Sequence, residues 1–459
     1  MSEATATPAT MTEPRIDALP KSLKMGWASG AFGIALLFNG IGALIFFYMV
    51  GILKIEPVLA GSMIFAVKLL GAFTDASAGA WSDRIASTRG RRRPFLFWGA
   101  FICALSFAMI FTAPAFTQMW MTAAYVFAGL CLFSIGYSVY NVSYLAMPAE
   151  MTDSYHERSS IHSYRIVFVT LGGFVAGALA PAALEALGKT ERSSYAIMGL
   201  VVAAMMLTSL LAAYYSTASA RYTAQGSAKP SIGKDFGEIF RNGHFMRLIG
   251  VKFMQLTAIQ CTQASLLFFL VQSLQLKLTI LVPFGLAMSV SSIIAAPLLV
   301  KFSKTRGKRA AYFLASTVYV IYSFSWVLAV PGEPLWALVL RGLVVGVAAT
   351  GNVMIAMSML TDIINFDARQ TGQRREGSYT AVYTFTEKLT GAMGPLLVGS
   401  MLSLAGFNNK LPSDVPQSGD VTAALLFTTA VLPGVLGVVA MLILAGYKLR
   451  QEDIEETAP

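Results

Sequence analysis

Charged residues are scarce in this 459-residue chain: Asp, Glu, Lys and Arg together make up only 13% of it. A soluble domain carries roughly 25% charged residues, so the deficit argues against an ordinary soluble enzyme or binding module. Hydrophobic residues make up 56%, and they form long runs such as Phe95–Thr112, which holds no charge. A run of about 18 apolar residues is typical of a membrane-spanning helix. The composition therefore favours a polytopic α-helical membrane protein.

Cysteine and histidine are also scarce, with three residues of each type. Cys103, Cys131 and Cys261 all fall inside apolar runs and have neither disulfide nor metal-ligand spacing. The sequence shows no nucleophile–base motif and no phosphate-binding loop. We therefore expect no metal, no cofactor and no enzymatic activity. The first 23 or so residues contain no apolar h-region, so we expect no cleavable signal peptide.

Twelve apolar runs are candidates for spanning helices. They lie near residues 25–52, 57–81, 94–113, 118–146, 163–187, 195–217, 245–273, 278–300, 310–330, 335–364, 378–405 and 421–447. The widest polar interruption follows the sixth run. We therefore predict an all-α membrane protein with two six-helix halves. In chain order it has a tail at 1–23, a six-helix half at 24–217, a linker at 218–243, a second six-helix half at 244–447 and a tail at 448–459.

Lys and Arg are distributed unevenly between the two sets of loops. One set contains Lys21, Lys24, residues 84–93, Arg158, residues 229–247, 301–309 and 369–375, Lys448 and Arg450. The opposite set contains only Lys54, Lys189, Arg192, Lys277 and Lys410. By the positive-inside rule, we expect a multi-pass protein of a bacterial inner membrane with both termini on the cytoplasmic side. The net charge of +10 arises from these loops, so we expect the lipid bilayer and no nucleic acid as a partner.

A short basic turn recurs at the same place in each half. Ser87–Arg92 follows the second predicted helix, Lys304–Arg309 follows the eighth, and both contain Thr-Arg-Gly-basic-Arg. Two related six-helix halves, with the substrate near the midplane between them, are the organisation of major facilitator transporters. The alternative is a pair of unrelated basic loops that obey the positive-inside rule. We expect four arginines of these turns to gate the cytoplasmic side: Arg91, Arg92, Arg306 and Arg309.

Charged residues inside the predicted spans are expensive and therefore indicate function. Lys68 and Asp75 share a face of the second helix, two turns apart, with Gly71 between them, so their side chains have room to approach each other. An aspartate that bonds to the eleventh helix or to loop groups is the structural alternative. Glu387 and Lys388 are neighbours on the eleventh helix and point about 100° apart, so both cannot face the cavity centre.

Lys388 is the better candidate for a cation that faces the cavity. It continues a stripe through Thr384, and Tyr383 lies on the adjoining face with Glu387. A lysine that is paired with a carboxylate for packing or gating is the alternative. Arg165 lies near the start of the fifth helix, and Arg341 lies near the outer end of the tenth. Either side chain can snorkel to the membrane–water interface.

Uncharged polar residues also occur in the spans. They are Asn39 on the first predicted helix, Tyr137, Ser138, Asn141 and Tyr144 on the fourth, and Gln263 on the seventh. Such residues either contact a substrate or form hydrogen bonds to neighbouring helices.

Three stretches of the chain resemble a known transporter family. They are Gly90-Arg-Arg-Arg-Pro94, Asn141-Val-Ser-Tyr-Leu-Ala-Met-Pro-Ala-Glu150 and its continuation to Arg158, and Thr361-Asp362 through Thr371-Gly-Gln-Arg-Arg-Glu-Gly377 to Lys388. Together they resemble the glycoside–pentoside–hexuronide:cation symporters, the melibiose permease group, over nearly the whole chain. The first stretch alone is also similar to plant sucrose symporters. The resemblance implies cation-coupled uptake by alternating access.

The resemblance assigns roles residue by residue. Asp75 matches the cation-site aspartate of the second helix, Lys388 matches the lysine of the eleventh helix, and Arg165 matches the arginine of the fifth. Other family positions are replaced here. On the second helix, Gly71 stands where the family has a companion aspartate, and Thr74 stands where it has an asparagine. On the fourth helix, Asn141 replaces the family's aspartate and Ser138 replaces the threonine before it. Ile34-Ala35 replaces the Lys-Asp pair of the first helix, and Val353 replaces the tryptophan of the tenth.

These replacements bear on both the ion and the substrate. A sodium site needs several oxygens, usually including carboxylate, whereas one acid is enough for a proton, so we expect H⁺ rather than Na⁺. Sugar hydroxyls are commonly held by carboxylates, and their loss disfavours a simple galactoside. An anionic substrate suits Lys388 and Arg165, and a more apolar one suits Ile34 and Val353.

The leading hypothesis is a monomeric proton-coupled symporter for a glycoside, a uronide or a related small solute. The alternatives are a lysolipid or amphiphile transporter on the same scaffold, and a membrane receptor without transport. The predicted cation-coupling residues are Asp75, Thr74, Ser138 and Lys68. The predicted substrate-binding residues are Asn39, Tyr137, Asn141, Tyr144, Arg165, Gln263, Tyr383, Thr384 and Lys388.

Overall fold

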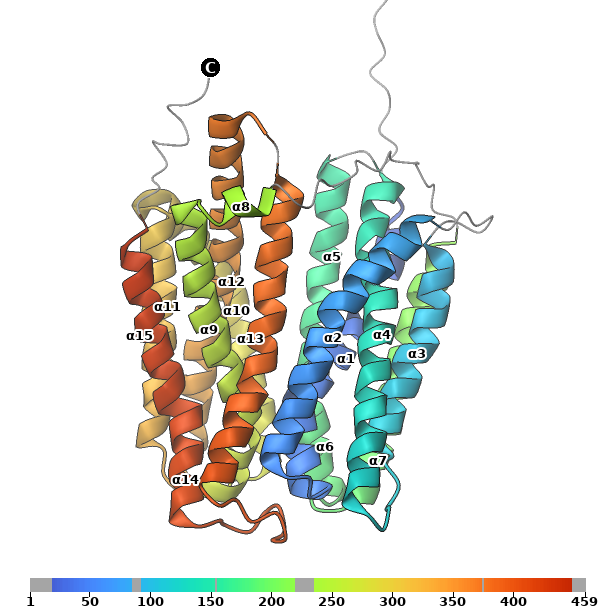
Figure 1. Ribbon diagram of the computed structural model, residues 1–459, viewed down its shortest axis with the longest axis vertical. Helices are drawn as coiled ribbons and strands as arrows, with labels where there is room; N and C mark the ends of the chain where they lie inside the picture. Colours follow the sequence, from blue (N-terminus) through green and yellow to red (C-terminus); the bar gives the residue numbers. More distant parts are fainter. Residues whose placement is uncertain (1–18, 85–91, 153–154, 219–234, 374, 448–459) are drawn as a thin grey trace, which may run out of the picture.

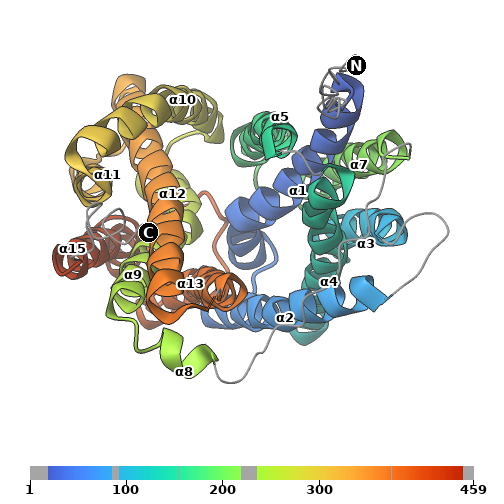
Figure 2. The same ribbon diagram turned by 90° about the horizontal axis from the view of Figure 1, so that it is seen from above.

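The computed structural model describes residues 19–84, 92–152, 155–218, 235–373 and 375–447, and every regular element in these residues is a helix. Two helical bundles stand side by side (Figures 1 and 2). The first contains α1 (Lys21–Phe47) continued by η1 (Tyr48–Ile52), α2 (Pro57–Arg84), α3 (Arg93–Phe111), α4 (Met119–Met151), α5 (Tyr155–Phe174) continued by η2 (Val175–Leu179) and α6 (Ala180–Leu187), and α7 (Arg192–Ser216).

The second bundle follows a short helix, α8 (Asp235–Ile239). It contains α9 (Gly243–Phe268) continued by η3 (Phe269–Ser273), η4 (Leu278–Ile280) with α10 (Leu281–Arg306), α11 (Lys308–Ser325) with η5 (Trp326–Leu328), α12 (Leu335–Thr371), α13 (Glu376–Leu404), and α14 (Gly419–Leu426) continued by η6 (Phe427–Val431) and α15 (Leu432–Ala445). We call the end of the bundles that holds Lys21 and Ala445 the proximal end, and the opposite end the distal end (Figure 1).

The described residues thus form twelve long helical segments, which confirms the predicted all-α fold. Eleven of the segments are long and apolar enough to cross a membrane. The twelfth is α13, whose mean hydropathy is lowered by Glu387 and Lys388. The long segment that is missing from these eleven is therefore one that carries two of the charges singled out above.

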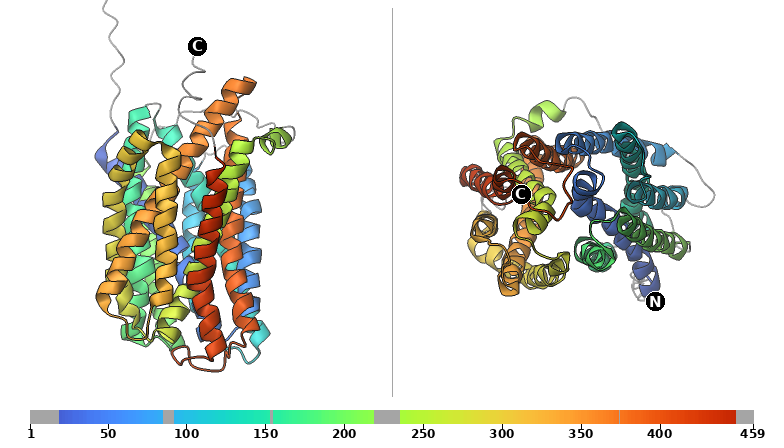
Figure 3. Two further views of the ribbon diagram at one scale, coloured as in Figure 1. Left: turned by 90° about the vertical axis from the view of Figure 1, so that its left-hand side faces the viewer. Right: turned by 90° about the horizontal axis from the view of Figure 1, so that it is seen from below.

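Several helices extend past the ends that hydropathy predicts. α12 continues to Thr371, whereas the apolar run ends near 364, and it projects beyond its neighbours at the proximal end (Figures 1 and 3). The length of an apolar run reflects the thickness of the hydrocarbon layer, whereas the helix itself can continue beyond that layer into water. The Ala218–Gly243 linker prediction lies largely outside the described residues, which resume at Asp235.

The two bundles meet tightly at the distal end. There the backbones of α2 and α13 touch: a Cβ atom on Gly61 would lie 2.5 Å from the Pro395 carbonyl oxygen, and one on Gly399 would lie closer still to the Pro57 carbonyl oxygen. Only glycine fits at such positions. Towards the proximal end the ribbons of α2 and α13 diverge (Figure 1).

The first helical segment of each bundle ends in the same way. α1 passes into the π turn η1 and α9 passes into the π turn η3. Each π turn is soon followed by a non-glycine residue with positive φ, Lys54 at 62° and Gln275 at 53°. The two bundles therefore share an irregular backbone feature as well as a helix order.

Candidate functional site

Asp75 lies where α2 of the first bundle meets α13 of the second. Its Oδ1 atom accepts a hydrogen bond from the Ser138 hydroxyl of α4, and its Oδ2 atom forms an ion pair with the Lys388 ammonium. The Thr74 hydroxyl lies 2.8 Å from the Ser138 hydroxyl. Side-chain exposures of 25% for Asp75 and 22% for Lys388 leave the pair within reach of solvent. The structure therefore brings together three of the predicted coupling residues and the predicted cavity lysine.

Lys388 reaches Asp75 by passing Gly71. Its ammonium donates a second hydrogen bond to the Gly71 carbonyl oxygen, at 2.7 Å. Because Gly71 has no side chain, the gap that we expected to serve Lys68 and Asp75 is used by Lys388 instead. The expected approach of Lys68 to Asp75 is therefore wrong in this structure, and the structural alternative, an aspartate bonded to the eleventh helix, is the arrangement observed.

Lys68 points elsewhere on the same interface. Its ammonium lies 5.7 Å from the centre of the Phe38 ring. It also reaches α13, because a Cβ atom on Gly391 would lie 3.0 Å from the Lys68 Nζ atom. Gly391 is three residues after Lys388, so Lys68 of α2 contacts α13 about one turn from the residue whose ammonium reaches α2.

A second ion pair stands beside the first. The Lys252 ammonium of α9 lies 3.5 Å from Glu387 Oε1 of α13 and 4.9 Å from the centre of the Tyr383 ring. The Lys252 side chain is 3% exposed and that of Glu387 is 45% exposed. Sequence reasoning passed over Lys252, although a lysine inside the apolar run 245–273 is itself a signal. The Tyr383 hydroxyl is buried and has no hydrogen-bond partner among the described residues.

Arg165 of α5 and Tyr137 and Asn141 of α4 are further predicted substrate residues of the first bundle. The Tyr137 ring lies 6.0 Å from the Phe38 ring of α1 between centroids. Two of their polar atoms are buried without a hydrogen-bond partner among the described residues, Asn141 Oδ1 and Arg165 Nε. Buried polar atoms are normally satisfied, so these two are available to a solute.

Tyr144 has a packing role in the structure. Its ring is fully buried and stacks on the ring of Trp27 at 4.5 Å between centroids. Its hydroxyl donates to the Trp27 carbonyl oxygen at 3.1 Å, and the Trp27 indole N–H donates to the Tyr144 carbonyl oxygen at 3.3 Å. These contacts join α1 to α4 and use the hydroxyl proton, while a direct contact between Tyr144 and the substrate stays a prediction.

Three further predicted substrate residues lie on other helices. The Asn39 side chain donates to the Ala35 carbonyl oxygen of its own helix at 2.9 Å and faces Gly173 of α5. Gln263 of α9 and Thr384 of α13 are exposed. Their role as substrate contacts stays a prediction.

The predicted gating arginines differ in their surroundings. Arg92 is buried directly before α3, Arg306 is exposed at the end of α10, and Arg309 donates to the Ala445 carbonyl oxygen at 2.6 Å. Arg91 lies outside the described residues. In the second basic turn, Lys308 forms an ion pair with Asp362 of α12 at 2.6 Å, so this turn is joined to the stretch that begins with Thr361-Asp362.

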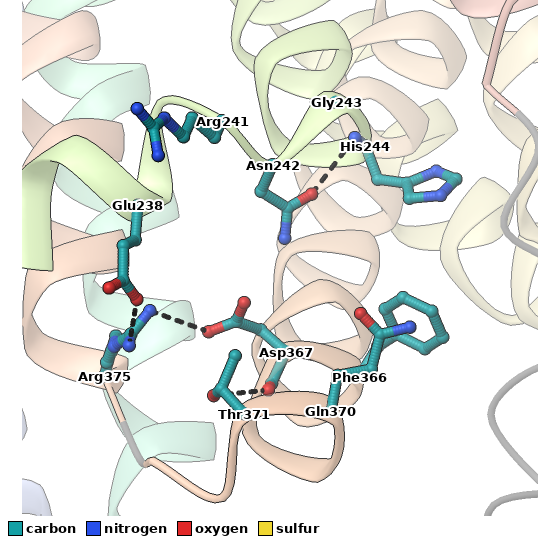
Figure 4. Close-up of a pocket in the computed structure, with 10 residues that line it drawn as sticks. All are labelled: Glu238, Arg241, Asn242, Gly243, His244, Phe366, Asp367, Gln370, Thr371 and Arg375. Carbon is teal, nitrogen blue, oxygen red and sulfur yellow. Dashed lines mark hydrogen bonds and ion pairs between the residues drawn. The ribbon is translucent and has the colours of Figure 1, made fainter.

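A pocket at the proximal end lies entirely in the second bundle and its short leading helix (Figure 4). It is lined by Glu238, Arg241, Asn242, Gly243, His244, Phe366, Asp367, Gln370, Thr371 and Arg375. Arg375 forms an ion pair with Glu238 and lies 4.0 Å from an Asp367 carboxylate oxygen. Because these contacts fasten α8 to α12 and α13, the pocket is an anchoring point for the segment between the bundles and lies apart from their interface.

Comparison with known proteins identifies the family of this chain. Residues 26–451 match the family model described as MFS/sugar transport protein. The chain is 28% identical over 413 residues to a putative sulfoquinovose importer of Salmonella typhimurium, covering 86% of this chain and 83% of the relative. It is 22% identical over 438 residues to the putative glycoside/cation symporter YagG of Escherichia coli, covering 94% and 93%.

The fold is shared with solved transporters. The structure of the nucleoside transporter NupG superposes with a TM-score of 0.63 at 16% identity, covering 93% of this chain and 100% of that one. An identity this low supports the fold alone. The family match covers most of the chain and confirms the resemblance to the glycoside–pentoside–hexuronide:cation symporters. The chain therefore belongs to the MFS/sugar transport protein family, and it is a multi-pass membrane transporter, not an enzyme.

Proposed function

We propose that this protein is a proton-coupled symporter that carries a sugar-like solute by alternating access. The observation that carries the proposal is the Asp75–Lys388 ion pair, which joins α2 of the first bundle to α13 of the second. Relatives named as a putative glycoside/cation symporter and a putative sulfoquinovose importer support a sugar-like solute. The preference of Lys and Arg for one set of loops supports a cytoplasmic proximal end.

The proposed coupling step is the protonation of Asp75. A proton on this carboxylate removes the charge that Lys388 neutralises, so the ion pair between the bundles is lost. Among the described residues, no other hydrogen bond or ion pair joins the bundles closer to the proximal end. Loading a proton therefore weakens the most proximal of these links, and losing the proton restores it.

A sodium ion fits the site less well than a proton. Hard cations take several oxygen ligands, and the oxygens near Asp75 are the hydroxyls of Thr74 and Ser138 and the Gly71 carbonyl, which already accepts from Lys388. The Lys388 ammonium already occupies the second carboxylate oxygen. A cation at this place would have to displace that ammonium, whereas a proton only has to neutralise the acid.

The test uses Asp75→Asn, with Asp420→Asn on the exposed first turn of α14 as the control. In membrane vesicles, Asp75→Asn should still exchange labelled solute for unlabelled solute but should not accumulate it when a proton gradient is imposed. The control should accumulate it as the unchanged protein does. Accumulation that requires Na⁺ and does not respond to a proton gradient would refute the proposal.

A further inference from the structure

A segment of the second bundle crosses onto the first bundle at the distal end. Residues 405–418 connect α13 to α14 and run along the distal side of the molecule, at the bottom of Figure 1. We call residues 408–413 of this connection the distal strap. Among the residues that the structure describes, four hydrogen bonds join the bundles at the distal end, and two of the four link the distal strap to Lys54. One residue of the first bundle therefore forms half of these links.

Lys54 contacts the distal strap with both its side chain and its main chain. Its ammonium donates to the Leu411 carbonyl oxygen at 2.6 Å, and its own carbonyl oxygen accepts from the Asn409 side chain at 2.9 Å. Lys54 lies between η1 and α2 with a φ of 62°. A left-handed conformation is unfavourable for a residue that has a side chain. The two hydrogen bonds to the distal strap help to hold Lys54 in this conformation.

The equivalent place in the second bundle has the same backbone without such a contact. Gln275 follows η3 as Lys54 follows η1, and its φ is 53°. Gln275 is exposed, and it takes part in none of the hydrogen bonds that join the described residues of the two bundles. The left-handed turn alone therefore does not explain why Lys54 is bonded to the opposite bundle.

Ser413 places the end of the distal strap between the two bundles. Its carbonyl oxygen accepts from the Gln272 side chain of η3 at 3.1 Å, and a Cβ atom on Gly51 of η1 would lie 3.2 Å from the Ser413 Cβ atom. Ser413 is only 3% exposed, and its hydroxyl has no hydrogen-bond partner among the described residues. Because η1 and η3 belong to different bundles, Ser413 would become exposed if the bundles separated at the distal end.

We infer that Lys54 and the distal strap form a latch that holds the distal end closed, and that both hydrogen bonds break when the bundles separate there to admit a solute. Lys54 and the distal strap lie outside the apolar spans, so water can replace each partner when the latch opens. The latch therefore stabilises the closed state and remains reversible. The inference goes beyond the proposed function, because it requires neither a particular solute nor a particular coupling ion.

The first test measures how often Ser413 becomes accessible. Ser413→Cys introduces a thiol at a hydroxyl that has no partner, in a background whose native cysteines are replaced by alanine. The rate at which a maleimide labels this thiol in the purified full-length protein reports opening of the distal end. Lys54→Met should raise the rate about tenfold, an order typical of losing one hydrogen bond to a charged group. Asn409→Ala should raise it less, because its hydrogen bond is neutral.

Two further variants are the controls. Lys54→Arg retains a charged donor and should keep labelling slow. Lys410→Met makes the same substitution as Lys54→Met at an exposed residue of the distal strap, and it should leave the rate unchanged. Asn409→Ala removes a contact of the latch from the opposite bundle, so the test does not depend on the folding of the Lys54 variants.

The second test separates opening of the bundles from local loosening of the distal strap. Spin labels are attached through Thr117→Cys and Lys277→Cys, two exposed distal positions in different bundles. Pulsed electron spin resonance then gives the distribution of distances between them. Lys54→Met should raise the ratio of longer to shorter distances by about tenfold, as the labelling rate does, because both report one equilibrium between closed and open states.

The other outcomes overturn the inference in different ways. If neither Lys54→Met nor Asn409→Ala changes the labelling rate, these contacts do not hold the distal end closed. If labelling becomes faster while the distances stay the same, Lys54 orders the distal strap and is not part of a latch between the bundles. Neither test uses solute uptake or a proton gradient. A result against the latch therefore leaves the proposed function standing, and a failure of proton coupling leaves the latch standing.

Discussion

The interface between the bundles and the interior of the second bundle both hold buried polar side chains, but they use them differently. In the interior, the Gln255 amide donates to the Ser316 hydroxyl at 2.8 Å and to the Asn352 side-chain oxygen at 3.1 Å. Its oxygen accepts from the Tyr312 hydroxyl at 2.7 Å. All four side chains are buried and none is charged. The interface instead holds ions, and several of them are accessible to solvent.

The difference separates polar groups that stabilise one bundle from polar groups that lie between the two bundles. The partners of Gln255 come from α11 and α12, which belong with α9 to one bundle and have no reason to separate from it. Asp75 and Lys388 belong to different bundles, so their ion pair must break whenever the bundles move apart. A neutral network inside a bundle stabilises that bundle. In the proposed mechanism, a charged pair between bundles makes their separation depend on the protonation of Asp75.

The largest effect on transport is expected when the cation that joins the two bundles is removed. Lys388→Ala should abolish uptake, by about a hundredfold or more, since both Asp75 and the Gly71 carbonyl lose their donor. The amount of protein in the membrane should not change. Uptake by membrane vesicles measures the effect, with Lys301→Ala, an exposed lysine of α10 outside the basic turn, as the control. Normal uptake by Lys388→Ala would exclude this lysine from the mechanism.

The matching change inside the second bundle should affect stability and spare transport. Gln255→Leu leaves the hydroxyls of Tyr312 and Ser316 and the Asn352 oxygen without their partner, at a cost of about 1–3 kcal/mol. The melting temperature of the purified protein should fall, while the KM for the solute stays within about twofold, because an uncoupled site changes little. Tyr312→Phe removes one donor and should give a smaller fall. A large rise in KM with an unchanged melting temperature would place Gln255 in the transport site.

The basic turns should affect rate more than affinity. Neutralising Arg91 or Arg309 should lower turnover by about threefold to tenfold and leave the affinity for the solute intact, because the two turns follow equivalent predicted helices and contain none of the predicted substrate-binding residues. Arg309 holds the end of α15 through the Ala445 carbonyl. Initial rates and equilibrium binding separate the two quantities. A large loss of affinity with full turnover would contradict a gating role.

The smallest effect is expected from an ion pair within the first bundle. The Lys24 ammonium lies 2.7 Å from the Glu157 carboxylate, and this hydrogen bond holds the pKa of Glu157 below its ordinary value. A lowered carboxyl pKa stabilises the fold above the ordinary pKa of the group, and the contribution is lost as the pH falls through the lowered value. Glu157→Gln should therefore change the melting temperature by about 2 °C or less near neutral pH.

The pH dependence of this variant provides its check. The difference in melting temperature between Glu157→Gln and the unchanged protein should be present near neutral pH and should vanish in acid, where Glu157 is protonated. Uptake should be unaffected, because the pair joins α1 to α5 inside one bundle. A difference that grows as the pH falls would show that the pair does not stabilise the bundle.

The helices and the individual charges were within reach of sequence reasoning, whereas their pairing was not. Apolar runs place all twelve segments because the bilayer sets their length. Asp75, Ser138, Thr74 and Lys388 each stand out as polar residues in such runs. That Lys388 rather than Lys68 meets Asp75 depends on how α13 packs against α2 at Gly71, and no local pattern encodes the distance between two helices.

Two other residues mark the limits of sequence reasoning in opposite directions. Tyr144 looked like a cavity residue because it shares a helix with Asn141, but its neighbour Trp27 lies 117 residues away in the sequence and takes its hydroxyl. Lys252 was detectable as a lysine in an apolar run, yet its partner Glu387 was set aside on the geometry of its own helix. In both cases the deciding contact comes from a helix that is distant in sequence.

The matched ends of the first and seventh helical segments bear on how this chain arose. α1 and α9 each pass into a π turn, and each turn is followed by a left-handed residue that is not glycine, Lys54 in one and Gln275 in the other. A left-handed conformation costs a non-glycine residue of order 1–3 kcal/mol, so two independent origins would each have had to accept that cost at the same place. A single ancestral six-helix protein whose gene was duplicated and fused explains both occurrences at once. The backbone then retains a trace of that event at positions where the side chains no longer agree.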